Sequence, residues 1–170
     1  MNDLLQTVTQ TLQEKFAAQA QEFRGEVTVM LLPEHNVEAL QTLRDDFHFE
    51  MLVDVTAVDY WPEEAPRFHI NYQLYSMSQN TLLRLRVPVK GNAPSLRSVE
   101  KVYPSANWYE REVFDLFGVR FEGHSDMRRI IMPADWEGHP LRKDYPLGYE
   151  EVQFTFNFDQ IQLRKTNPKS

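Results

Sequence analysis

The chain has 170 residues, no cysteine and a formal net charge of −7. This length predicts one domain whose core needs no disulfide. The absence of cysteine excludes disulfides, thiolate zinc sites and cysteine-ligated iron–sulfur clusters, and the acidic balance argues against a protein that wraps nucleic acid. No apolar run approaches the roughly 20 residues of a membrane-spanning helix, so we expect any membrane association to come through partner proteins.

The N-terminal part of the sequence predicts two helices and one strand. Apolar residues at spacings of three and four predict an amphipathic helix over residues 2–19. A short apolar run predicts a strand over residues 27–32. Asn36 is a suitable N-cap for a second helix, whose apolar side extends to Phe47.

Three further strands are predicted over residues 51–60, 67–74 and 83–89. The connections between them are short, which favours an antiparallel meander. Pro88 cannot donate a ladder hydrogen bond, so the end of its strand is expected at an edge of the sheet or with its bonds facing outward. A short helix is predicted over residues 94–102.

These elements predict an α+β fold for residues 1–104: a two-layer domain with a mostly antiparallel sheet of about four strands and helices on one face. In the strand over residues 67–74, Phe68 and the residues at spacing two from it face one way, and Arg67 faces the other.

Residues 105–147, which we call the signature segment, begin with a predicted helix and then turn irregular. Ser105 is a suitable N-cap and Gly118 a suitable stop for this helix. Arg111 and Asp115 are four residues apart and are expected to pair along one face. Beyond Gly118, closely spaced glycines and prolines predict an irregular, extended docking segment of the same domain.

The composition of the signature segment favours protein–protein contact. Interface centres are rich in aromatic residues, Met and Arg, and the segment supplies nine such side chains: Trp108, Tyr109, Arg111, Arg128, Arg129, Met132, Trp136, Arg142 and Tyr145. The alternative is an irregular subdomain whose aromatic residues fill its own core. Composition does not separate the two interpretations.

The order of these residues resembles the signature of the 30-kDa subunit of respiratory complex I, the proton-pumping NADH:quinone oxidoreductase. About two dozen positions match in fixed order, which makes the resemblance far more specific than a single short motif. The departures are Ser125, where the family usually has Pro, and Met127, where it usually has Leu. The residues that carry the resemblance, and that it implies as partner-docking residues, include Trp108, Glu110, Arg111, Glu112, Asp115, Gly118, His124, Arg128, Arg129, Trp136, His139, Arg142, Lys143, Asp144 and Tyr145.

The resemblance implies a component of the hydrophilic arm that holds no cofactor, with FMN and the iron–sulfur clusters on partner subunits. It implies packing on the 49-kDa subunit, which forms much of the quinone site, and along which residues 148–170 would lie as an extended tail. The implied location is the cytoplasmic side of the cell inner membrane, or the matrix side in a mitochondrion.

Chemistry within this chain has few candidates. His124 and His139 lack the spacing of a metal site, and each lies at a turn, so we interpret both as structural. Glu110, Glu112 and Asp115 are an acid/base group in principle, but the arginines of the same segment are expected to hold them ionised in ion pairs. We therefore predict no catalytic, cofactor-binding or metal-binding residue in this chain.

Two other functions stay open. The same type of protein serves related membrane-bound hydrogenases and complexes driven by ferredoxin or F420H2, and this sequence does not name the electron donor. A function of a different class is a free-standing adaptor or a small metalloprotein that uses His124 and His139.

Overall fold

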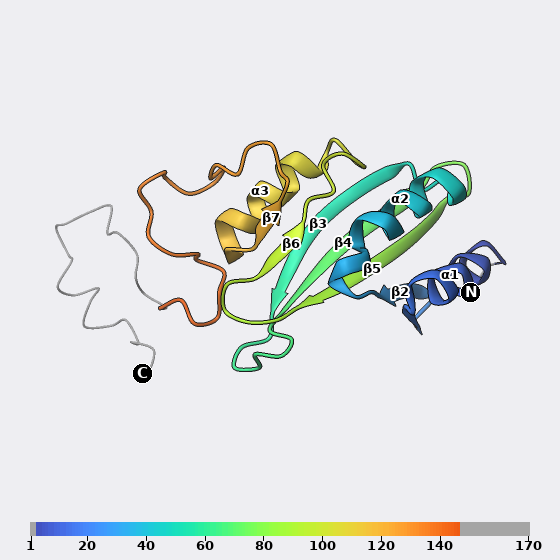
Figure 1. The fold of residues 1–170 in the computed structure, drawn as a ribbon, viewed down its shortest axis with the longest axis horizontal. Coiled ribbons are helices and arrows are strands. Elements are labelled where there is room, and N and C mark those ends of the chain that lie inside the picture. The colour runs from blue at the N-terminus through green and yellow to red at the C-terminus, as the bar shows by residue number, and fades with distance from the viewer. Residues whose placement is uncertain (1–2, 147–170) are drawn as a thin grey trace.

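The computed structural model describes residues 3–146. The expected tail over residues 148–170, and Leu147 of the signature segment, lie outside the described residues. The elements in chain order are α1 (Asp3–Phe16), β1 (Gln19–Phe23), β2 (Glu26–Met30), a 3-10 turn (Pro33–His35), α2 (Asn36–Phe47), β3 (Met51–Asp59), β4 (Phe68–Ser76), β5 (Thr81–Val89), β6 (Ser95–Arg97), α3 (Ala106–Phe117) and β7 (Arg120–Glu122) (Figure 1).

The main sheet has five strands in the order β1-β2-β5-β4-β3. Strands β3, β4 and β5 form the predicted antiparallel meander, and β2 joins β5 in parallel. The parallel pairing of β2 and β5 ends at Met30 and Arg86, so Pro88 lies beyond the end of β2, where a missing N–H breaks no bond to that strand.

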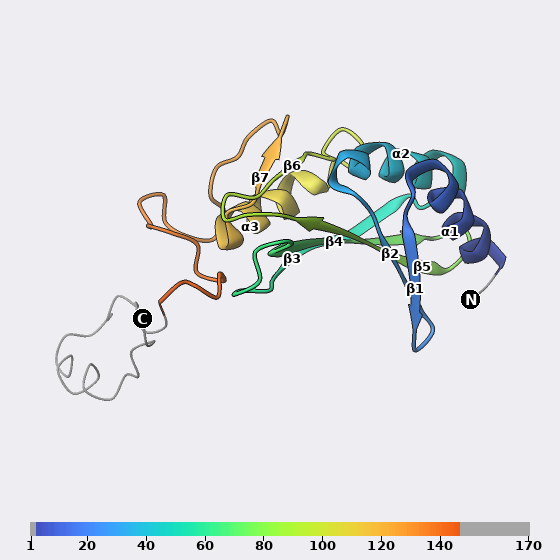
Figure 2. The same cartoon turned by 60° about the horizontal axis from the view of Figure 1, so that its bottom comes forward.

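One face of this sheet forms the core. Its buried side chains lie in register across the three meander strands, as in the row Val55, Tyr72 and Leu85. Helices α1 and α2 lie together on that side (Figure 2), and α3 packs on β3. The α+β prediction, with a mostly antiparallel sheet and helices on one face, is confirmed.

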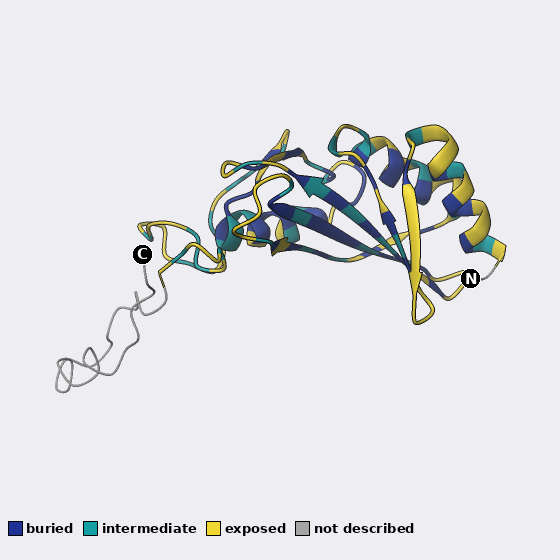
Figure 3. Ribbon diagram, turned by 90° about the horizontal axis from the view of Figure 1, so that it is seen from below, coloured by how far each residue is buried: buried dark blue, intermediate teal, exposed yellow. Residues whose placement is uncertain are grey.

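Three local predictions were wrong in the N-terminal part. Residues 17–19 do not continue the first helix, because Ala17 takes a positive φ of 52° and β1 begins at Gln19. β1 was not predicted because its residues are polar and exposed throughout (Figure 3), so no hydrophobic pattern marks it. Asn36 is the first residue of α2 and not its cap; its side-chain amide donates to the carbonyl of Arg97 at 2.7 Å.

The helix predicted over residues 94–102 is also wrong. Leu96, Val99 and Val102 are spaced by three and all are buried, which imitates a helical pattern. Residues Ser95–Arg97 instead form β6, which pairs in parallel with β7. A pairing partner 25 residues away in sequence (Ser95 with Arg120) decides this structure, and local periodicity does not reveal such a partner.

Candidate partner-docking site

The signature segment begins with α3, the helix predicted before Gly118, and the apolar side of this helix packs on the sheet. Ala106 and Val113 are buried, and Tyr109 and Phe117 pack against the core. Gly118 ends the helix with a φ of +74°. Ser105 precedes the helix, but its side chain makes no capping hydrogen bond, because its backbone is already helical.

Asp115 shapes the backbone that follows β7. Its side chain is buried on α3, and its Oδ2 accepts the N–H groups of Ile130, Ile131 and Met132 at 3.0, 2.7 and 2.9 Å. Its Oδ1 accepts Arg129 Nη1 at 2.6 Å. Burial opposes ionisation, yet these hydrogen bonds hold the pKa of Asp115 below its usual value. One ionised carboxylate therefore satisfies three backbone donors of an irregular loop.

Arg111 does not pair with Asp115, contrary to the prediction. Its Nε donates to the carbonyl of Arg128 at 3.0 Å, and its Nη2 donates to the carbonyl of Arg129 at 3.3 Å. Arg111 and Asp115 thus hold opposite polar groups of the same loop, one its carbonyls and the other its N–H groups.

Residues 139–142 of the signature segment form hydrogen bonds with the carbonyls at the C-terminal end of α3. His139 Nδ1 lies 2.9 Å from the carbonyl of Asp115, and Arg142 Nε donates to the carbonyl of Phe117 at 2.6 Å. Leu141 N–H donates to the carbonyl of Leu116 at 3.0 Å. Free carbonyls at the end of a helix carry partial negative charge, so a cation such as Arg142 is favoured there.

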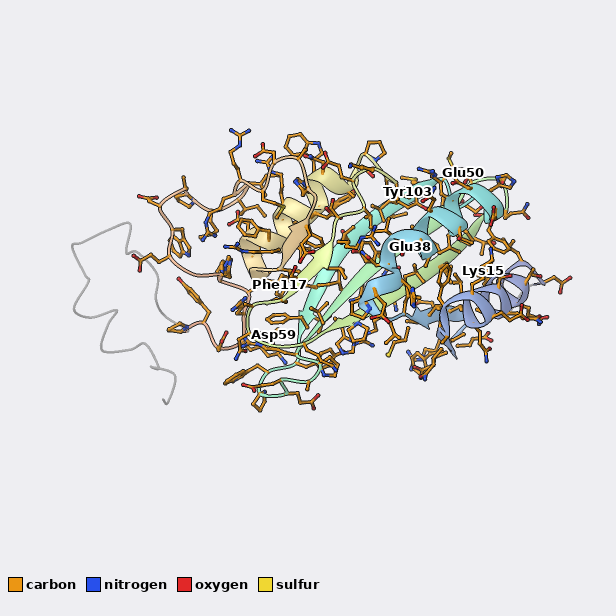
Figure 4. The ribbon with its side chains drawn as sticks, in the orientation of Figure 1. Lys15, Glu38, Glu50, Asp59, Tyr103 and Phe117 are labelled. Carbon is orange, nitrogen blue, oxygen red and sulfur yellow. The ribbon has the colours of Figure 1, made fainter. Side chains whose placement is uncertain are left out.

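A second contact holds the same segment against the meander. Arg67 is fully buried; it makes a two-pronged ion pair with Asp59 at 3.0 and 2.9 Å and meets Asp144 at 2.7 Å. Asp59 Oδ2 also accepts the N–H of Lys143 at 2.9 Å. Asp59 and Phe117 lie at the same end of the domain (Figure 4). These bonds hold residues 142–144 against the ends of both α3 and β3.

Sequence reasoning missed Asp59 and Arg67. Arg67 was expected on the outward face of its strand, but the side chain lies between the rings of Trp61 and Phe68, 4.7 and 4.8 Å from their centroids. In the sequence, Asp59 lies near the end of one predicted strand and Arg67 at the start of the next, so their pairing across the connection could have been predicted. Nothing in the alternation of that strand shows that its first side chain turns inward.

Glu110, unlike Asp115, is buried without an arginine partner among the described residues. Its buried carboxylate accepts Ser98 Oγ at 2.6 Å and the N–H of Val99 at 2.8 Å. Burial raises its pKa to about 7. The prediction that arginines hold Glu110 ionised was therefore wrong, because α3 turns it toward the loop after β6 and away from them.

His124 and His139 are both engaged in local hydrogen bonds. His124 Nε2 lies 3.1 Å from the carbonyl of Asn107, and its Nδ1 accepts the N–H of Asp126 at 2.9 Å. The proton of a neutral His124 therefore lies on Nε2. Across residues 3–146, no group of three or more His, Cys, Asp or Glu side chains is placed to hold a metal ion.

The remaining signature residues divide into inner and outer sets. Trp136 and Tyr145 are half-buried within the segment: the carbonyl of Trp136 accepts Arg129 Nη2 at 2.9 Å, and the Tyr145 ring lies over Gly138. To this extent the segment does use its aromatic residues for its own packing. Glu112 and Lys143 are exposed, and the side chain of Arg128 is 80% exposed beside Asp126.

Large apolar side chains remain uncovered on the same segment. Trp108 is 59% exposed, with Arg111 5.1 Å above its ring, and Ile131 is 56% exposed. We call the exposed apolar side chains of this segment the signature patch: Trp108, Ile130, Ile131 and Leu141. Ile130 and Ile131 carry two of the three N–H groups that Asp115 binds, so the buried charge fixes the loop that presents them.

The chain is similar to known proteins over most of its length. The model of the family described as "Respiratory-chain NADH dehydrogenase, 30 Kd subunit" matches residues 29–151. The C subunit of the NADH-quinone oxidoreductase of Roseiflexus sp. (strain RS-1) is 48% identical over 146 residues, which cover 85% of this chain and 83% of that protein. A trypsin-resistant fragment (1–134) of Nqo5 superposes with a TM-score of 0.65 at 32% identity, over 72% of this chain and 98% of the fragment.

A chain of the membrane-bound sulfane sulfur reductase, an archaeal respiratory membrane complex, superposes with a TM-score of 0.74 at 26% identity, over 86% of this chain and 87% of that chain. Within residues 3–146, no helix is long and apolar enough to cross a bilayer. The resemblance found in the signature segment is confirmed by the family match and by the identity to the Roseiflexus protein. The chain belongs to the family of the respiratory-chain NADH dehydrogenase, 30 Kd subunit.

Proposed function

We propose that this chain is a structural component of the peripheral arm of a proton-translocating NADH:quinone oxidoreductase and that it holds no cofactor. The observation that carries the proposal is the 48% identity to the Roseiflexus NADH-quinone oxidoreductase protein across 85% of the chain. In this role the chain packs on the 49-kDa subunit and supports electron transfer from NADH, through iron–sulfur clusters on other subunits, to quinone. Its place is the cytoplasmic or matrix face of the membrane.

The signature segment has the physical properties of a docking surface. Buried ion pairs fix its backbone without help from another chain, as at Asp115 and Arg67. Its outer surface carries the signature patch, with exposed Trp and Ile side chains beside arginines. Pre-ordered backbone lowers the entropy cost of association, and desolvated aromatic and Arg side chains supply most of the binding free energy. We therefore assign contact with the 49-kDa subunit to this patch.

Co-purification of the complex tests the assignment. Ile131→Lys places a charge in the signature patch, and Met77→Lys makes the same change at a similarly exposed side chain in the β4–β5 turn. We expect Ile131→Lys to lower recovery of the 49-kDa subunit and Met77→Lys to leave it unchanged. Equal recovery with both variants would refute the assignment of contact to this patch.

One observation favours a related assembly as the second candidate. The likeness to a chain of the sulfane sulfur reductase shows that a similar protein is part of a different respiratory membrane complex. Identification of the co-purified proteins distinguishes the two: an NADH- and FMN-binding partner supports NADH as the donor, and its absence supports the related assembly. The purified chain alone is expected to be colourless and not to oxidise NADH.

A further inference from the structure

The face of the sheet opposite the helices is a separate surface of the domain. Its side chains lie in cross-strand rows, and the central row holds Met30, Arg86, Asn71 and Thr56 on four neighbouring strands. The burial pattern of β3, β4 and β5 alternates, so that these rows are mostly half-buried while the opposite rows form the core. No described helix covers this face (Figure 2).

Arg86 is a cation without a counter-charge on that face. Across residues 3–146, no carboxylate lies within ion-pair distance of it. Its guanidinium lies 5.4 Å from the centroid of the Tyr60 ring, and its Nη2 donates to the Tyr60 hydroxyl. Its Nε is buried and has no hydrogen-bond partner among residues 3–146. This unmet donor and the missing counter-charge leave the guanidinium incompletely compensated within residues 3–146.

Arg86 meets the Tyr60 hydroxyl, which acts as an acceptor, and His69 lies beside the same ring. The His69 ring lies 4.8 Å from the Tyr60 ring in a tilted arrangement, and its Nδ1 is likewise buried without a partner among residues 3–146. Burial, and secondly the charge of Arg86, lower the pKa of His69, which keeps the imidazole neutral at pH 7. The site therefore has one positive charge, two unmet polar nitrogens and an aromatic ring.

Arg84, two residues earlier on the same strand and the same face, shows the contrast. It meets Glu26 of β2 at 3.2 Å, so its charge is compensated within the chain. Within residues 3–146, Arg84 has a carboxylate partner and Arg86 has none. Directly opposite Arg86 on β2 lies the exposed apolar side chain of Met30. With Tyr60 this gives the combination of Arg, Tyr and Met that interface centres favour.

We propose that this open face is a second docking surface, where a partner protein places an Asp or Glu carboxylate against Arg86. A carboxylate matches the geometry of a guanidinium and supplies the negative charge that Arg86 lacks within residues 3–146. The bond from Nη2 to the Tyr60 hydroxyl holds the guanidinium in place, so a partner carboxylate would meet a cation whose position is already set. The signature patch and this face are made of different residues on different elements, so the chain would contact a partner through each.

Cross-linking in the assembled complex tests this inference. A photoreactive benzophenone side chain replaces Met30, beside Arg86, and in a separate variant Ile131 of the signature patch. We expect position 30 to link to a protein segment with an Asp or Glu within a few residues of the linked site. A lipid adduct, a segment without an acidic residue, or no adduct at all would overturn the inference. A successful link from position 131 in the same preparations would show that the proposed function stands independently.

Charge reversal provides the matched comparison. Arg86→Glu is expected to lower recovery of the partner found at position 30 about tenfold or more, whereas Arg84→Glu changes it less than about threefold. Reversing the charge of the cross-linked acidic residue in the partner should restore recovery with Arg86→Glu. Equal losses in the two single variants, or no rescue by the partner's reversed charge, would overturn the assignment of a carboxylate to Arg86. Thermal unfolding of both variants checks that each still folds.

Discussion

Replacement of Gly118 by alanine tests how the signature segment is held to α3. A Cβ built at Gly118 would lie 2.6 Å from His139 Nε2 and 2.7 Å from Arg142 Nη2. Both distances are far inside van der Waals contact, so the alanine must displace side chains that bond the end of the helix. Gly123 is the matched control, because its φ of +83° is similar to the +74° of Gly118 and a Cβ there meets nothing within 4 Å.

The expected magnitudes follow from these two environments. Both variants place alanine in the left-handed region, at a cost of about 1–2 kcal/mol. Gly118→Ala additionally disturbs the hydrogen bonds that His139, Leu141 and Arg142 make with the last turn of α3. At about 1 kcal/mol for each bond, the further loss is about 3 kcal/mol. Gly118→Ala should therefore destabilise the chain by about 4–5 kcal/mol, and Gly123→Ala by about 1–2 kcal/mol.

Urea unfolding measures both free energies, and hydrogen exchange locates the loss. We expect Gly118→Ala to raise exchange at the Leu141 N–H, which donates to the carbonyl of Leu116, while Gly123→Ala leaves it protected. Equal free energies of unfolding for the two variants would refute the reasoning, since only the left-handed backbone would then matter. Unchanged protection of Leu141 in Gly118→Ala would show that the segment does not depend on this contact.

Three further predictions concern the charges of the segment. Asp115→Asn should cost about 3 kcal/mol in urea unfolding, because Arg129 loses its buried partner; a loss below about 1 kcal/mol would contradict this. Burial raises the pKa of Glu110 from 4.5 to about 7, so the folded state binds this proton more tightly than the unfolded state. The resulting stabilisation of the folded state is fully present below pH 4.5 and is lost as the pH rises through 7. Between these pH values the free energy of unfolding of the wild type should thus fall by about 3 kcal/mol relative to that of Glu110→Gln. Parallel pH profiles of stability for the two proteins would contradict the raised pKa of Glu110. Arg128→Ala should change the free energy of unfolding by less than about 1 kcal/mol. Arg142→Ala should cost about 2 kcal/mol, because it removes both the bond to a helix carbonyl and the contact with the Phe68 ring. Equal effects of the two variants would count against the division into outer and inner arginines.

Much of the fold follows from local patterns in the sequence. The alternation over β4 and β5 gives both the strands and the buried face, and the short connections give the antiparallel meander. The helix before Gly118 is marked by its apolar spacing and by a glycine that can take a positive φ. Such patterns are readable because each depends on residues within a few positions of one another.

The predictions that were wrong concern features that depend on residues far apart in the sequence, or that have no hydrophobic pattern. β1 has no hydrophobic pattern. The sequence of β6 has the apolar spacing of a helix, and its pairing with β7 makes it a strand. The buried partners of Asp115, Arg67 and Glu110 lie 8 or more residues away in the sequence. Spacing along the chain does not reveal such contacts, because the energy of a buried charge depends on which groups the whole fold brings to it.

By itself, the sequence determined the α+β class, the place of the signature helix and the family to which the chain belongs. The tertiary structure alone decided which signature residues face inward and which face outward. Asp115 and Arg142 turned out to hold the segment together, while Trp108 and Ile131 remain exposed on its surface. The physical reason is that residues suited to an interface occur in both sets, and only burial and hydrogen bonding in the folded chain distinguish a side chain that shapes a surface from one that forms it.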